Sequence, residues 1–275
     1  MRIASRRLRE LLPLLELHPD RAKKIGRRLR KVTRRLGTVR ELDVVMLLID
    51  ELHVSRRPHS AALSRVGVLV SKQRDEARTK LFEREPAEVL RKVVKRLGKR
   101  ADSLQQKRST AVETRVRRWA VDARVARRAA QLHAAIDDAG GVYLPERLHT
   151  VRVAVKKLRY SLELATDLSA PRATSTSEKV AGDLRALRRM QDILARMHHV
   201  QELIEHVRVT QAQVSPPNLT VWREFDMLIR ALDDDCRRLH ARYMRMRSPV
   251  MAIVDKLSER RKGQAAVPRS ARQVG

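Results

Sequence analysis

One segment carries basic side chains at spacings that suit anion binding. They are His149, Arg152, Lys156 and Arg159. On a helix these positions share an arc of about 80°, and their like charges repel by roughly a few tenths of a kcal/mol per pair. A bound polyanion would relieve that repulsion, because arginine chelates phosphate oxygens in pairs and lysine acts as a point charge. The row predicts a phosphate-binding face.

The other side of the same segment is apolar. Its members are Val151, Val155, Leu158 and Leu162. They span about 60°, centred roughly 110° from the cations. The segment is therefore predicted to be an amphipathic helix that packs on one side and leaves its basic row accessible.

The pattern occurs twice in the chain. Residues 2–9 match residues 152–159 at an offset of 150, and residues 27–36 match residues 185–194 at an offset of 158. The first match makes Arg2, Arg6 and Arg9 counterparts of Arg152, Lys156 and Arg159. Repeats of this length indicate two homologous helical bundles.

The second matching segment is basic in both copies. The cations of its first copy, which share an arc of about 100°, are Arg27, Arg30, Lys31 and Arg34. Those of its second copy are Arg185, Arg188 and Arg189. Two such helices side by side would form a groove for a phosphate chain, with a strongly salt-dependent affinity.

The elements that position these residues are predicted to be helices almost throughout. Aromatic residues make up only 3% of the chain, helix-favouring residues dominate and no strand-like alternation occurs, so we predict an all-α fold. Proline and glycine divide it into helices of about 15 to 30 residues, and Pro13 is expected to kink or end the first. The breaks are predicted at His18-Pro19-Asp20, Arg57-Pro58, Glu85-Pro86, Gly140-Gly141, Ala170-Pro171, Pro216-Pro217 and Ser248-Pro249.

The glycine pair at 140–141 is the predicted boundary between the halves. We expect a first bundle over residues 1–139 and a second over residues 142–260. Residues 261–275 lack an apolar period and are predicted to be a disordered basic tail.

Overall charge points to a polyanionic partner. Lys and Arg number 61 against 32 Asp and Glu, a formal charge of +29, while 43% of residues are hydrophobic. The chain can fold but repels itself, which indicates nucleic acid, polyphosphate or an anionic membrane surface as partner. The single Cys236 excludes an intramolecular disulfide. Without a predicted signal peptide or membrane span, a cytoplasmic location is expected.

Two segments carry a family resemblance. His149-Thr-Val-Arg152-Val-Ala-Val-Lys156-Lys-Leu-Arg159-Tyr160 resembles the signature helix of the CHAD family, the conserved histidine α-helical domain. Residues 187–200 resemble the family's second motif, as do residues 36–44 in the first half. The resemblance implies two four-helix bundles related by pseudo-twofold symmetry, a basic central groove or pore, and binding of inorganic polyphosphate without catalysis or cofactor. It also implies a location that can include polyphosphate granules.

The resemblance also assigns phosphate contacts by position. In the second half they are His149, Arg152, Lys156, Arg159, Arg185, Arg188 and His198. In the first half they are Arg2, Arg6, Arg9, Arg27, Arg30 and Arg40. Three features depart from the family pattern. The opening histidine of the first motif would precede Met1, so we expect either a truncated first helix or a true N-terminus upstream of Met1. Ala195 replaces a glycine, and His199 stands where an acidic residue is common.

Other chemistries find less support in the sequence. No phosphate-cradling glycine loop or hydrolase motif occurs, and Glu83-Arg-Glu85-Pro-Ala87 lacks the terminal base of a triphosphate-cleaving motif. We therefore predict no enzyme activity. His198, Glu202 and His206 share helical spacing that could suggest a metal, but we predict none.

Nucleic acid is the main rival ligand, because any basic groove attracts it non-specifically. Stacking platforms for bases are scarce in the basic rows: Tyr160 is expected to support the basic helix, and Trp119 and Trp222 are expected to pack into cores. Weak nucleic-acid binding stays the alternative. Membrane insertion is not expected, because the basic arcs carry no large apolar residues beside them.

Overall fold

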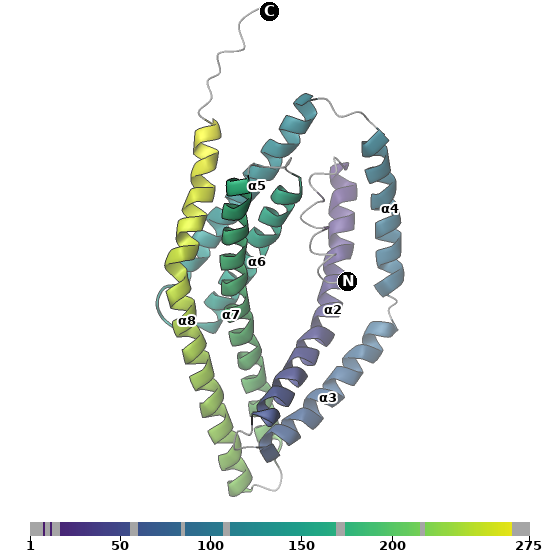
Figure 1. Ribbon diagram of the computed structural model, residues 1–275. Coiled ribbons are helices and arrows are strands. Elements are labelled where there is room, and N and C mark those ends of the chain that lie inside the picture. The colour runs from purple at the N-terminus through teal and green to yellow at the C-terminus, as the bar shows by residue number, and fades with distance from the viewer. Residues whose placement is uncertain are drawn as a thin grey trace, which may run out of the picture. The chain divides into compact units, whose positions relative to one another are not determined.

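The computed structural model describes residues 17–55, 60–83, 86–106, 111–168, 174–214 and 218–265, together with Leu8 and Leu12 (Figure 1). Throughout these residues the regular structure is helical and no strand occurs. The helices are α2 (Pro19–Val54), α3 (Ser60–Phe82), α4 (Pro86–Gln106), α5 (Ala111–Ala139), α6 (Pro145–Asp167), α7 (Thr174–Ala212) and α8 (Leu219–Ala265). The all-α prediction is confirmed.

Proline marks three of the helix starts, as predicted at two of them. α2, α4 and α6 begin at Pro19, Pro86 and Pro145, where a fixed φ suits the first turn and the missing N–H has no intrahelical acceptor to lose. The predicted glycine break separates α5 from α6, and Gly140 there has a φ of 60°. Only glycine adopts that conformation readily.

The predicted break at Ser248-Pro249 is wrong, because α8 continues through Pro249. Contacts within the same compact unit hold the helix on both sides of the proline. Arg247 Nη1 donates to Gly140 O at 2.8 Å, and Lys256 Nζ lies 3.1 Å from Asp183 Oδ2 on α7. Burial of Val250 and Val254 adds to these contacts, which offset the hydrogen bond that proline cannot donate.

Three helices are longer than the sequence predicted. α2 has 36 residues, α7 has 39 and α8 has 47. A further helix boundary, between α4 and α5, was not predicted from the sequence. α8 also extends to Ala265, past the predicted start of the tail at residue 261. The remaining tail, residues 266–275, and Pro13 lie outside the described residues.

The chain forms two compact units that do not follow chain order. Unit 1 contains residues 1–108 and 195–240, and unit 2 contains residues 109–194 and 241–275. The boundary predicted at 140–141 lies within unit 2, in the turn between α5 and α6. The two predicted halves, 1–139 and 142–260, follow the sequence repeat along the chain. That each half folds as a separate bundle stays a prediction.

α2 buries different sides in its two halves. Its N-terminal half buries Ile25 and Leu29 in a cluster with Val93 and Leu97 of α4. Its C-terminal half packs on α3 through another arc, roughly 170° away on an ideal helix, that contains Leu42, Val45, Leu48, Ile49 and Leu52. The basic row of α2 therefore faces away from the first core and ends where the same side of the helix turns apolar.

α7 repeats this arrangement. Near residues 180–194 its buried side is opposite Arg185, whereas from Met197 onward the buried side has moved by about 120°. The match between residues 27–36 and residues 185–194 thus corresponds to a shared design of α2 and α7. In each helix the basic row lies on the side opposite the first group of buried residues.

Candidate anion-binding site

A buried carboxylate organises the basic surface of unit 2. Glu163 on α6 is 7% exposed, and its Oε1 accepts from Arg159 Nη1 at 2.5 Å and from Arg188 Nη2 of α7 at 3.1 Å. Arg159 Nε also donates to Gln191 Oε1 at 2.9 Å. A buried charge is tolerated when it is paired and hydrogen-bonded. Glu163 therefore joins two neighbouring helices through two arginines.

Arg159 is held more firmly than the sequence suggested. Its side chain is only 12% exposed, and its Cζ lies 4.4 Å from the centroid of the Tyr160 ring, a cation–π geometry. Its three partners are Tyr160 and Glu163 on α6 and Gln191 on α7. Arg159 is thus oriented by the protein, and Tyr160 supports the basic helix as expected.

The other cations of this surface are more accessible. Arg188 keeps 56% of its side chain exposed although it contacts Glu163, and Arg185 is exposed one turn earlier on α7. On α6, His149 is exposed and Arg152 and Lys156 are half-buried. The structure therefore brings the α6 and α7 rows together where Arg188 contacts Glu163. Arg185 and Arg188 are exposed and accessible to an anion.

The basic row of α2 is accessible along its length. Its members, all exposed, are Arg27, Arg30, Lys31 and Arg34. Among the described residues, no hydrogen bond or ion pair engages any of them. Their charge is uncompensated locally, which strengthens attraction for a polyanion.

The remaining predicted residues fall elsewhere. Arg40 is exposed but lies about 80° outside the arc of the α2 row on an ideal helix. His198 belongs to unit 1, where its Nδ1 is 3.9 Å from Glu202 Oε1. Arg2, Arg6 and Arg9 lie outside the described residues.

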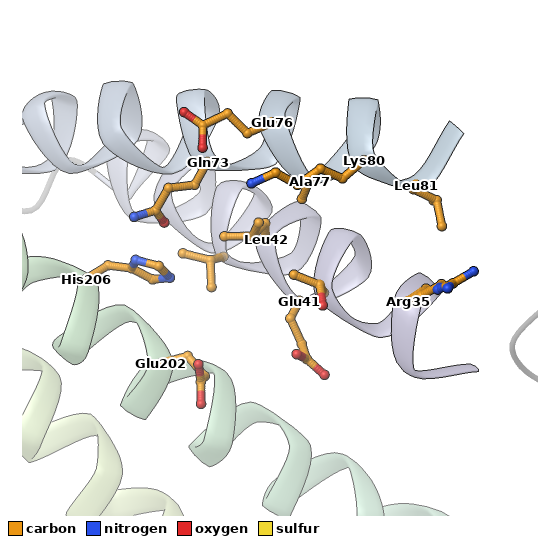
Figure 2. A pocket seen from close by; sticks show the side chains of 12 residues that line it. Arg35, Glu41, Leu42, Gln73, Glu76, Ala77, Lys80, Leu81, Glu202 and His206 are labelled. Carbon is orange, nitrogen blue, oxygen red and sulfur yellow. The ribbon is translucent and has the colours of Figure 1, made fainter. Parts of the chain in front are cut away.

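A cleft of about 500 Å³ in unit 1 receives side chains from α2, α3 and α7 (Figure 2). Its lining includes three carboxylates, Glu41, Glu76 and Glu202, besides Arg35 and Lys80. In Figure 2, Glu41 from α2 and Glu202 from α7 both extend into the space between those helices. This acidic content makes the cleft a poor site for phosphate and marks the end of the basic row on α2.

His206 lines the same cleft. Burial lowers the pKa of His206 below its usual value, and the neighbouring Glu205 opposes that shift only in part. Desolvation disfavours the imidazolium form. His206 is consequently neutral at physiological pH and adds no positive charge for an anion.

Two other kinds of site find no support in the described residues. They contain no cluster of three His, Cys, Asp or Glu side chains that could hold a metal ion. No helix in this part of the chain is long and apolar enough to cross a membrane.

Sequence reasoning missed the centre of the site and misplaced two aromatic residues. Glu163 follows Arg159 by four residues and continues the arc of the row, a signal that spacing alone could have revealed. The prediction that Trp119 and Trp222 are buried is wrong, because they are 62% and 48% exposed. On α5 the buried positions are aliphatic, and on α8 the buried aromatic side chains are Phe225 and Tyr243 in place of Trp222.

Comparison with known proteins identifies one family. The family model of the CHAD domain matches residues 1–208, which include both basic motifs and end within α7. No curated protein matches the chain.

Proposed function

The chain belongs to the CHAD domain family, and we propose that it binds inorganic polyphosphate without catalysis, through basic helix faces in both of its repeats. The observation that carries this proposal is the pairing of Glu163 with Arg159 and Arg188. It holds one arginine in place and presents another on an accessible surface, so less side-chain freedom is lost when a phosphate binds.

The chemistry of the exposed groups supports a phosphate chain. Guanidinium groups on α2 and α7 can chelate phosphate oxygens in pairs, and each helix displays them in a row one turn apart. A linear polyanion can contact successive members of such a row and release counterions at each contact. We further propose that the two repeats form pseudo-symmetric four-helix bundles around a basic groove or pore, which would bring rows of both kinds to one ligand. Location on polyphosphate granules would follow.

The proposal includes the absence of catalysis. The carboxylate in the basic surface, Glu163, is engaged by two arginines, and this leaves it poorly suited to act as a general base. Incubation of the pure protein with long-chain polyphosphate should release no orthophosphate. Measurable release would contradict this part of the proposal.

A pair of charge-neutralising variants tests the binding surface. Arg185→Gln with Arg188→Gln should weaken polyphosphate binding and reduce the slope of log affinity against log salt by about 1.4, or roughly 0.7 per lost contact. Arg159 is left unchanged, because its replacement would remove the hydrogen bond that it donates to the buried carboxylate of Glu163. Isothermal titration at three salt concentrations measures both quantities.

The matched control removes two charges elsewhere in unit 2. Arg127 on α5 and Arg245 on α8 are exposed, and no hydrogen bond or ion pair engages them among the described residues. Arg127→Gln with Arg245→Gln should change affinity and slope much less. Equal losses in both double variants would show that only net charge matters, and the proposed surface would be wrong.

One observation favours nucleic acid as the second candidate ligand. Trp119 on α5 is 62% exposed, and the exposed Arg115 stands one turn before it. An accessible indole beside a guanidinium is a platform on which a base can stack. If nucleic acid is the ligand, Trp119→Ala should weaken binding of single-stranded DNA; polyphosphate, which has no bases, should be unaffected.

A further inference from the structure

A basic cavity lies in unit 1, at the start of α2 and one turn before its basic row. It encloses about 590 Å³ between the start of α2 and α4, within the range of small-molecule sites. Of the residues that the structure describes, four cations line it: Arg21, Lys24, Arg96 and Lys99. Ser103 adds a hydroxyl, and Leu17 and Ile25 add apolar surface. None of the described residues in this lining is a carboxylate.

Helix packing sets these side chains around one space. Ile25 of α2 is 6% exposed and packs in a cluster with Val93 and Leu97 of α4. Arg21 and Lys24 stand at i and i+3 beside that contact on α2, and α4 supplies its own cations at the same spacing. The shared apolar cluster therefore holds together two helices that each contribute one cationic pair to the cavity.

The described residues supply no counter-charge to the cations of the cavity. Among the described residues no ion pair or hydrogen bond engages any of the four cations. Glu88, a carboxylate on α4, contacts Lys92 at 2.6 Å instead. The site thus differs from the surface around Glu163, where a carboxylate offsets the arginines. Four like charges around a concave space repel one another and attract a compact anion.

We propose that this cavity binds a small anion that carries a triphosphate group. A triphosphate brings about four negative charges in a short chain, which matches the four cations, and guanidinium and ammonium groups both bind phosphate oxygens. Leu17 and Ile25 give apolar surface to an organic part of the ligand. The cavity shares no residue with the α2, α6 and α7 rows proposed to bind polyphosphate.

Titration of the full chain with tripolyphosphate and, separately, with ATP tests the proposal. Both ligands should bind, and Arg96→Gln with Lys99→Gln should weaken each by about tenfold or more. Tighter binding of ATP than of tripolyphosphate would identify an organic triphosphate as the ligand type; the reverse order would identify an inorganic one. Circular dichroism should show unchanged helicity, because both replaced side chains are exposed.

A matched control removes the same charge from α3 of the same unit. Arg65 and Arg78 are exposed and lie outside the cavity lining, so Arg65→Gln with Arg78→Gln should alter triphosphate affinity by less than about twofold. An equal loss in both double variants, or no loss in Arg96→Gln with Lys99→Gln, would overturn the site.

The two binding proposals fail separately. Arg185→Gln with Arg188→Gln should leave triphosphate affinity unchanged, and loss of the cavity cations should leave the contribution of α7 to long-chain binding intact. Triphosphate binding that depended on Arg185 and Arg188 would assign the ligand to the polyphosphate surface and refute the cavity site.

Discussion

The two repeats carry the same basic motif but balance its charge differently. In the second repeat, Glu163 binds Arg159 and Arg188, and Gln191 accepts from Arg159. The matching position to Glu163 in the first repeat is Pro13, and the position matching Gln191 is Thr33. Neither can supply a carboxylate.

The consequence is visible on α2. Thr33 Oγ1 donates to Leu29 O at 2.7 Å within its own helix. Arg30, the counterpart of Arg188, is exposed and has no ion-pair partner among the described residues. In the second repeat a buried carboxylate thus orients the arginine side chains. In the first repeat the described arginines of α2 have no such partner. The same motif therefore positions an arginine in one copy and attracts anions at long range in the other.

The largest expected effect comes from removing the carboxylate. Glu163→Ala leaves the guanidinium of Arg159, 12% exposed, without its charged partner, which typically costs about 3 kcal/mol. We expect the free energy of unfolding to fall by about that amount in urea denaturation. The control Glu178→Gln removes an exposed carboxylate on α7 and should change the free energy of unfolding little. A loss for Glu163→Ala no larger than for this control would show that Glu163 does not organise the surface.

An intermediate effect should separate the two rows in polyphosphate binding. Arg27→Gln, Arg30→Gln and Arg34→Gln together should lower the salt slope by about 2. The equivalent change at Arg185, Arg188 and Arg189 should lower it less, because Glu163 already offsets part of that charge. Titrations of both triple variants over the same salt range measure the difference. A larger change for the α7 variant would reverse the proposed division of roles.

The smallest expected effect concerns pH and unit 1. Because burial lowers the pKa of His206, the unfolded chain takes up its proton first as pH falls below about 6.5. Stability should therefore decline from that pH down to the lower folded-state pKa. His206→Gln should flatten this decline in unfolding measurements at pH 7.5 and 5.5. His18→Gln, which alters an exposed histidine, should retain it; a flat profile in the unchanged protein would contradict the assignment.

Helix periodicity made the fold class and the basic rows predictable, because residues spaced by about 3.6 positions lie on the same side of a helix. Proline and glycine marked Pro19, Pro86 and Gly140 correctly for the same local reason. Pro249 misled because the contacts that support α8 beyond the proline, such as Lys256 with Asp183, join segments distant in sequence. The cavity between α2 and α4 depends on tertiary packing of Ile25 against Val93 and Leu97, which periodicity does not encode.

Competition between polyphosphate and nucleic acid tests which polyanion the basic rows bind. The protein, saturated with labelled long-chain polyphosphate at physiological salt, is titrated with duplex DNA and with single-stranded DNA at equal phosphate concentration. We predict that polyphosphate stays bound, because the rows on α2 and α7 offer arginine forks for phosphate and no aromatic platform among their own members. Displacement of polyphosphate by either DNA would contradict the central claim.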